Sequence, residues 1–265
     1  MTAEPELAPG LHGPATAEPG LTYRFLRQLW RLLAGLLRVR LVLEGAEHLP
    51  RDERGRPRGG WIAAVVPHRT WIDPFVPWIL LAARPRFAFF GDARAMARSP
   101  LRRFVVRRLG GVIPISAARD PRAMDGHIEA AKAVLGAGAV FMIMPETGAA
   151  SALGEIRRLG GGMAYIALRT GAPIVPLVLG GNDELYFGRS IVLRALPALD
   201  PLEPAGLASA DHLTVPGSTT ERDAAHRLTA AFATRVEDAV AEVHRAAQPP
   251  TGARKRGRFL TRLFR

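Results

Sequence analysis

The chain has 265 residues, a formal net charge of +12 and no cysteine. The missing cysteines exclude a disulfide framework, a cysteine-based zinc site and a thiol nucleophile. The longest stretches without a charged residue, 133–145 and 170–182, are 13 residues long. A spanning helix needs about 20 apolar residues, so no transmembrane helix is expected. The start has no basic segment before an apolar run, which predicts no secretory signal peptide.

The positive charge is concentrated near the two ends of the chain. Residues 21–40 carry five arginines and no acid, and residues 254–265 carry six basic residues and no acid. By contrast, the acidic residues outnumber the basic ones in 1–20, and the long stretch 41–253 has only a small excess of positive charge. Basic ends of this kind indicate an anionic partner, either nucleic acid or anionic lipid.

The first two segments differ sharply in composition. Residues 1–20 contain four prolines and three glycines, which predicts a disordered leader. Residues 21–40 follow as a basic amphipathic helix, in which four arginines fall within about 60° of arc: Arg24, Arg27, Arg31 and Arg38. Most of its remaining surface is apolar, as in a helix that lies in a membrane interface. The alternative is a helix that packs on the core and keeps its arginines in solvent.

Short apolar runs then alternate with helical stretches. We predict strands at 39–44, 61–66, 86–91, 111–115, 139–144, 173–179 and 191–195. Helices are predicted at 101–109, 121–135, 161–169 and 221–246, with an irregular connection over 197–217. Such alternation predicts a single α/β domain over 41–247, with a mostly parallel or mixed central sheet flanked by helices. Residues 248–265 are expected to form a linker and a basic tail.

Nucleotide, nucleophile and metal motifs are absent from the sequence. It has no phosphate-binding loop with the Gly-Lys-Ser/Thr ending, no Gly-x-Gly-x-x-Gly turn, no Gly-x-Ser-x-Gly elbow and no His-Glu-x-x-His. The seven histidines lack ligand spacing, so no metal site is predicted.

One pair of residues suggests acid–base chemistry. The predicted strand at 61–66 runs into the segment HRTWID, which holds His68 and Asp73. Pro74 follows, which predicts that Asp73 is the N-cap of the next helix. The pair would then occupy a strand-to-helix turn at the carboxyl end of a strand, where open α/β sheets place their sites. There the carboxylate can bind one ring nitrogen of His68 and leave the other as a base. Alternatively, His68 is only a turn histidine beside a helix cap.

Two further segments could complete a site. In VFMIMPETG a buried strand ends at Pro145, Glu146, Thr147 and Gly148, which is either a site loop or a turn with an exposed glutamate. The segment GAPIVPLVLGG reads as an apolar core strand that could form one wall of a site.

Taken in order, these segments resemble the glycerolipid acyltransferase superfamily, which includes lysophosphatidate and glycerol-3-phosphate acyltransferases. EGAEHLP resembles the lead-in to its first motif, and HRTWID matches its His-x-x-x-x-Asp motif. LGGVIPIS lies where the family has its second block, MPET matches the Pro-Glu of the third, and APIVPL resembles the fourth. The resemblance covers about residues 40–200 and is specific because the order and the spacing both agree.

The resemblance implies a mechanism and a set of site residues. His68 would remove the proton of the acceptor hydroxyl, and Asp73 would orient His68. The hydroxyl would attack the thioester of acyl-CoA or of an acyl-carrier protein, the co-substrate, with no further cofactor and no metal. The second and third blocks would bind the acceptor, which assigns Glu146, Thr147 and Gly148 to substrate binding.

The sequence departs from the family at the residues that hold a phosphate. The third block usually reads Glu-Gly-Thr-Arg, whereas this chain continues Thr147-Gly148-Ala149, and Ser116 stands where the second block carries arginine. A charge-assisted phosphate contact is costly to lose. Its candidate replacements are Arg119, Arg157 and Arg158, unless these are solvated surface arginines.

The expected function is therefore a peripheral membrane O-acyltransferase of phospholipid biosynthesis. It would act on 1-acyl-glycerol-3-phosphate (lysophosphatidic acid) at an anionic membrane, on the cytoplasmic face of the cell membrane, with no nucleic-acid partner. An acyltransferase with a non-phosphomonoester acceptor is the alternative. Two other classes stay open: a lipid hydrolase using Ser116 or Ser151, and a non-catalytic basic module that binds membrane or nucleic acid. The sequence predicts no oligomeric state.

Overall fold

The computed structural model describes residues 17–71, 73–92, 111–115, 121–147, 154–208, 217–250, 255–257 and 260–261. The helix predicted at 101–109 lies outside these residues, as do Arg119 and Gly148. The leader predicted at 1–20 is described only from residue 17.

A seven-stranded sheet forms the centre of the domain, in the order β1-β7-β6-β2-β5-β3-β4. β6 and β7 are antiparallel, and every other neighbouring pair is parallel. The strands are β1 (Arg40–Glu44), β2 (Trp61–Val66), β3 (Phe87–Asp92), β4 (Val112–Ile115), β5 (Val140–Ile143), β6 (Ile174–Gly180) and β7 (Ser190–Ala195). Each observed strand lies within one residue of its predicted bounds. The predicted single α/β domain with a mostly parallel, mixed sheet is confirmed.

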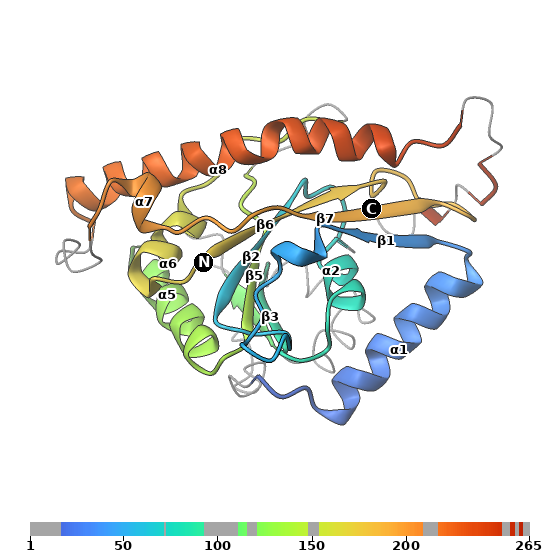
Figure 1. Ribbon diagram of the computed structural model, residues 1–265, viewed down its shortest axis with the longest axis horizontal. Coiled ribbons are helices and arrows are strands. Elements are labelled where there is room, and N and C mark those ends of the chain that lie inside the picture. The colour runs from blue at the N-terminus through green and yellow to red at the C-terminus, as the bar shows by residue number, and fades with distance from the viewer. Residues whose placement is uncertain are drawn as a thin grey trace, which may run out of the picture.

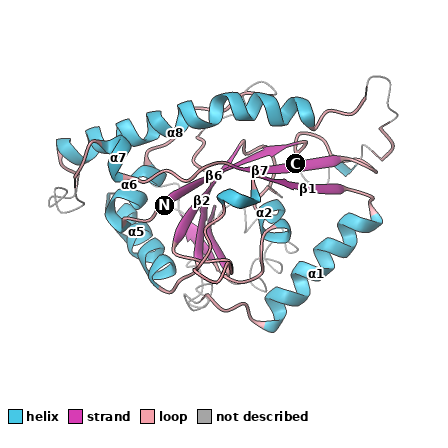
Figure 2. Ribbon diagram, viewed as in Figure 1, coloured by secondary structure: helices cyan, strands magenta, loops and turns pink. Residues whose placement is uncertain are grey.

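Helices cover both faces of this sheet (Figures 1 and 2). α5 (Pro121–Gly136), α6 (Gly162–Thr170) and α8 (Thr219–Ala246) pack on one face, and α1 (Leu21–Leu36) and α2 (Phe75–Leu80) on the other. Two short helices, η1 (Ala46–His48) and α7 (Leu202–Ala205), lie in connections. Side chains along β2 alternate between the faces, with Ile62 and Ala64 in the first core and Ala63 and Val65 in the second. This period of two is that of a strand buried on both sides.

Three helix predictions need correction. The helix predicted over 21–40 ends at Leu36, and β1 begins at Arg40. The connection predicted as irregular over 197–217 contains α7. α8 begins at Thr219, two residues before its predicted start, because Ser218 caps it and accepts a hydrogen bond from Glu221 N at 3.2 Å. Ser218 and Glu221 have the spacing of a capping box.

The orientation of α1 differs from what its amphipathic pattern suggests. Arg27 is buried, and its guanidinium donates to the carbonyls of Trp78, Ile79 and Leu81 at the end of α2. The alternative that α1 keeps its arginines in solvent is therefore wrong for this residue. The outward face is apolar and exposes Leu21, Phe25, Leu29, Leu32, Leu33 and Leu36. Within the described residues, none of the helices combines the length and apolar character that crossing a bilayer requires.

The described part of the predicted basic tail packs on the domain. Leu260 is buried, and Thr261 Oγ1 both accepts from Leu185 N at 2.9 Å and donates to Leu185 O at 3.0 Å. Lys255 pairs with Glu184 at 2.6 Å. These contacts tie the tail to the loop between β6 and β7.

Candidate active site

The histidine and aspartate of HRTWID meet at the carboxyl end of β2. His68 Nδ1 lies 3.0 Å from Asp73 Oδ2. The Asp73 side chain is fully buried, whereas the His68 side chain is 38% exposed. An ionised carboxylate only accepts hydrogen bonds, so Nδ1 carries the proton and Nε2 is the nitrogen left to act as a base. A side chain exposed to this extent can be reached from solvent, as a base that acts on a bound substrate must be.

The Asp73 carboxylate is saturated by donors from its own turn and from the loop after β6. Its Oδ2 accepts from Arg69 N at 2.5 Å and Thr70 N at 2.7 Å. Its Oδ1 accepts from Thr70 Oγ1 at 2.7 Å and Asn182 Nδ2 at 3.1 Å. Hydrogen bonds to the charged form stabilise an ionised carboxylate, which compensates for its complete burial.

The prediction that Asp73 caps the following helix is wrong. α2 begins at Phe75, its N-cap position is Pro74, and no side chain caps it. The Asp73 carboxylate instead binds backbone N–H groups that precede it in the chain, as the Arg69 and Thr70 contacts show. An aspartate that closes a turn on the residues before it makes the same local sequence pattern as an N-cap.

Glu146 reaches the same turn from the neighbouring strand β5. Its Oε2 accepts a hydrogen bond from His68 N, and its Oε1 accepts one from Arg157 N at 2.7 Å. The residue is half-buried, so it is not the exposed turn glutamate of the alternative interpretation. Its carboxylate links the backbone of the HRTWID turn to the loop before α6.

Thr147 and the two nearby arginines lie on paired segments beside Glu146. Thr147 N donates to Arg158 O at 2.8 Å, and Thr147 Oγ1 donates to the same oxygen at 3.1 Å. Together with the Arg157 contact to Glu146, this pairing brings Thr147, Arg157 and Arg158 next to the His68 turn along their main chains. Arg119 and Gly148, the other predicted substrate-binding residues, lie outside the described residues.

Asn182 and Thr70 belong to this site, and the sequence analysis did not select either. Asn182 donates to Pro67 O at 3.0 Å as well as to Asp73. A signal for it exists in the sequence, because it is the only asparagine of the chain and follows directly after a buried strand and two glycines. Nothing in the sequence singles out Thr70 in the same way, because it is one of several polar residues of the HRTWID turn.

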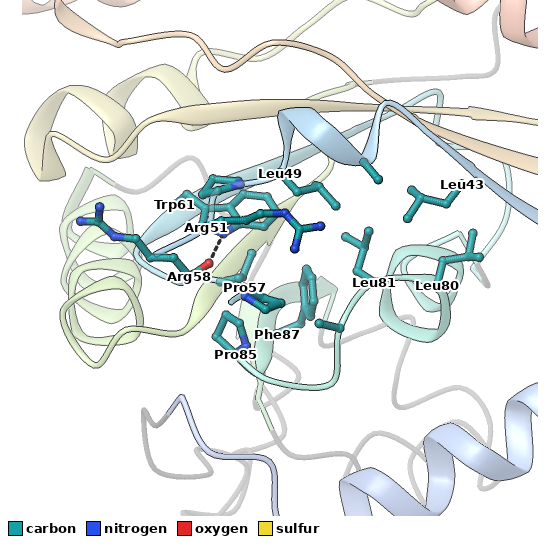
Figure 3. Close-up of a pocket in the computed structure, with 14 residues that line it drawn as sticks. Leu43, Leu49, Arg51, Pro57, Arg58, Trp61, Leu80, Leu81, Pro85 and Phe87 are labelled. Atoms are coloured by element: carbon teal, nitrogen blue, oxygen red, sulfur yellow. Dashed lines mark hydrogen bonds between the residues drawn. The ribbon is translucent and has the colours of Figure 1, made fainter. Parts of the chain in front are cut away.

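A separate, largely apolar cavity of about 140 Å³ lies at the amino ends of β2, β3 and β5. Figure 3 shows Trp61, Phe87 and Leu81 around it, with Arg51 and Arg58 among its lining residues. Trp61 begins β2, and His68 follows seven residues later, which is roughly 23 Å at about 3.3 Å per residue. The cavity is therefore distinct from the His68 site.

Comparisons with known proteins identify the family and the fold. The family model described as Acyltransferase matches residues 40–180. A search of curated proteins found no match. Among solved structures, the chain is similar to the 1-acyl-sn-glycerophosphate (LPA) acyltransferase PlsC from Thermotoga maritima, with a TM-score of 0.55 and 20% sequence identity. The alignment covers 82% of this chain and 79% of that chain. This likeness shows the fold.

Proposed function

The chain belongs to the acyltransferase family, and we propose that it transfers a fatty acyl group from acyl-CoA or acyl-carrier protein to a lysophospholipid hydroxyl. The preferred acceptor is 1-acyl-glycerol-3-phosphate, the class of substrate named for the similar PlsC structure. The observation that carries the proposal is the contact between partly exposed His68 and fully buried Asp73.

The proposed reaction is direct acyl transfer with His68 as general base. Nε2 takes the proton of the acceptor hydroxyl while the oxygen of that hydroxyl attacks the thioester carbonyl carbon. The C–S bond then breaks, and the departing thiolate takes that proton back from the imidazolium. Asp73 stabilises the imidazolium through Nδ1. A positioned base of this kind contributes about 10²–10⁴-fold in rate.

His68→Ala tests this mechanism. The expected result is a loss of about 10²–10⁴-fold in the release of thiol from acyl-CoA with lysophosphatidate, with an unchanged melting temperature. His226→Ala is the control, because His226 is exposed on α8. Undiminished turnover in His68→Ala contradicts the proposed role, and labelling by a serine-reactive phosphonate would instead support a hydrolase.

The identity of the acceptor is the part of the proposal for which the sequence offers a specific alternative. This chain has Gly148 and Ala149 where the family carries threonine and the phosphate-binding arginine, which favours an acceptor without a phosphomonoester. In the proposal, Arg119, Arg157 and Arg158 supply the replacement charge. Mass spectrometry of products over a panel of lysolipids separates the two acceptors: preferential acylation of lysophosphatidate supports the first, and a preference for an uncharged or diester acceptor supports the second.

We also propose that α1 holds the enzyme on the cytoplasmic face of an anionic cell membrane. Its six exposed apolar side chains fall within about 120° of arc, and exposed Arg24 lies on the flank of this face. Apolar side chains toward the lipid and basic ones toward the headgroups are the pattern of an interfacial helix. The exposure of Leu21, at 85%, and Leu36, at 67%, leaves their apolar surface in water unless lipid covers it.

Leu32→Glu tests the membrane proposal with vesicles of phosphatidylglycerol and phosphatidylcholine. Burying a leucine side chain contributes about 1.5–3 kcal/mol, so the partition coefficient should fall about 10- to 100-fold. Ala230→Glu, at an exposed position of α8, makes the same charge change and should leave binding intact. Equal losses in both variants would mean that charge alone governs binding, and no binding by the wild type would contradict the proposal.

A further inference from the structure

The loop after β6 is built to turn one side chain back toward β2. Gly181 has a φ of +82°, and a Cβ at this position would lie 2.2 Å from Ser190 O. Glycine is therefore required here on both conformational and steric grounds. Immediately after this turn, Asn182 is buried, with 7% of its surface exposed.

The amide of Asn182 contacts both ends of the HRTWID turn. Nδ2 donates to Pro67 O at 3.0 Å and to Asp73 Oδ1 at 3.1 Å. Pro67 directly precedes His68, and Asp73 ends the motif. One NH₂ group, with two protons at a fixed angle, thus sets the distance between the start of the turn and its carboxylate.

The loop that carries Asn182 is itself held rigidly. The guanidinium of Arg189, only 1% exposed, donates to Gly181 O at 2.9 Å, to Asp183 Oδ1 at 2.7 Å and to the Tyr186 hydroxyl at 3.1 Å. Gly181 and Asp183 flank Asn182 in the chain. The buried arginine therefore holds the residue on each side of the asparagine, Gly181 through its carbonyl and Asp183 through its carboxylate.

We propose that Asn182 is a positioning residue that keeps the Asp73 carboxylate aligned with His68. Thr70 Oγ1 and Asn182 Nδ2 occupy Oδ1, which prevents the carboxylate from rotating and leaves Oδ2 facing His68 Nδ1. The described hydrogen bonds of the Asn182 amide go to Pro67 O and Asp73 Oδ1 and not to the imidazole, so it acts through Asp73. This inference rests on the proposed role of His68 as the base.

Two variants of Asn182 separate hydrogen bonding from charge. Asn182→Leu keeps the number and branching of the side-chain heavy atoms and removes both donated hydrogen bonds. It should lower kcat about 10- to 100-fold, the loss of a hydrogen bond to a charged group, with little change in KM. Asn182→Asp is closer still in shape and places a second carboxylate about 3 Å from a fully buried one. Two such carboxylates share one proton. The shared proton replaces the hydrogen bond of the amide to Asp73, whereas Pro67 O loses its donor.

The decisive readout is the pH dependence of each variant relative to the wild type. For Asn182→Asp, the ratio of kcat/KM to the wild-type value should fall as pH rises, because loss of the shared proton makes the two carboxylates repel and favours protonated His68. For Asn182→Leu, which adds no ionisable group, the ratio should be independent of pH. Gln248→Leu removes an amide from an exposed site and should match the wild type throughout.

NMR distinguishes failure of this inference from failure of the proposed function. The ¹⁵N signals of the His68 ring, identified by their absence in His68→Ala, should titrate at higher pH in Asn182→Asp than in the wild type, with or without substrate. If His68→Ala abolishes activity while the Asn182→Asp ratio and ring titration match the wild type, the positioning role is wrong and the base assignment stands. If the ring titration shifts but His68→Ala retains activity, the proposed mechanism fails and the coupling stands.

Discussion

Replacing Glu146 with glutamine tests how this carboxylate serves the site. The side chain accepts one hydrogen bond from His68 N and another from Arg157 N. Glutamine has nearly the same shape, but its NH₂ group must face one of these N–H donors, and its remaining oxygen carries no charge. Hydrogen bonds to a charged group contribute about 1.5–3 kcal/mol each, and neutral ones about 0.5–1.5 kcal/mol. Losing one and weakening the other costs about 2–4 kcal/mol.

The assay separates a positioning role from the substrate-binding role that the family resemblance implies. If Glu146 positions His68, kcat at saturating acceptor should fall, by about 30-fold to several hundred-fold when the whole cost appears in the transition state. If Glu146 binds the acceptor, KM should rise while kcat stays unchanged. Glu237→Gln, at an exposed position of α8, is the control. A wild-type kcat together with a raised KM would refute the positioning argument.

Three other substitutions test the fold around the site. Arg27→Met leaves the α2 carbonyl of Trp78 without its side-chain donor and that of Ile79 with Arg31 alone. It should cost about 2–3 kcal/mol and speed hydrogen exchange in α1, and unchanged exchange would contradict the docking contact. Phe232→Ala, at a fully buried position of α8, should lower the free energy of unfolding in urea by about 3–5 kcal/mol. A loss below 1 kcal/mol would contradict the packing of this side chain in the core. Burial raises the pKa of Glu221, but hydrogen bonds from Arg169 and from the backbone outweigh it and hold the pKa below its usual range. The wild type should therefore lose stability as pH falls from about 4.3 through that lower pKa. Glu221→Gln should be less stable than the wild type at neutral pH by about 3 kcal/mol, and its stability should depend less on pH. Parallel stability–pH curves for the two proteins would contradict the pairing of Glu221 with Arg169.

The sheet was predictable because each strand is a short apolar run bounded by turn residues. β2 and β6 are buried at every position, so local composition and length were enough to place their ends within a residue. The contact between His68 and Asp73 was also predictable, since a strand-to-helix turn brings residues five apart within reach. The direction of the Asp73 hydrogen bonds was not, because an N-cap and a backward-closing turn use the same residue type.

Two features depend on contacts that local sequence patterns do not encode. The period of 3.6 residues identifies the arginine stripe of α1. Only the position of α2 decides that Arg27 points inward and donates to the carbonyl groups at the end of that helix. The contact between Asn182 and Pro67 joins residues 115 positions apart. Predicting it requires knowing that β6 lies beside β2 in the sheet, which is a property of the strand order.

Strand order also explains why a histidine and an aspartate five residues apart do not by themselves make a site. β2 lies between β5 and β6, and the segment after each neighbour sends one polar side chain to the turn after β2. Glu146, after β5, accepts a hydrogen bond from the backbone N–H of His68. Asn182, after β6, donates hydrogen bonds to Pro67 O and Asp73 Oδ1. The turn is thus held from both sides at its main chain and at its carboxylate. Because small misplacements of a catalytic group cost large factors in rate, the same motif without these two neighbours would place an imidazole at the surface without orienting it.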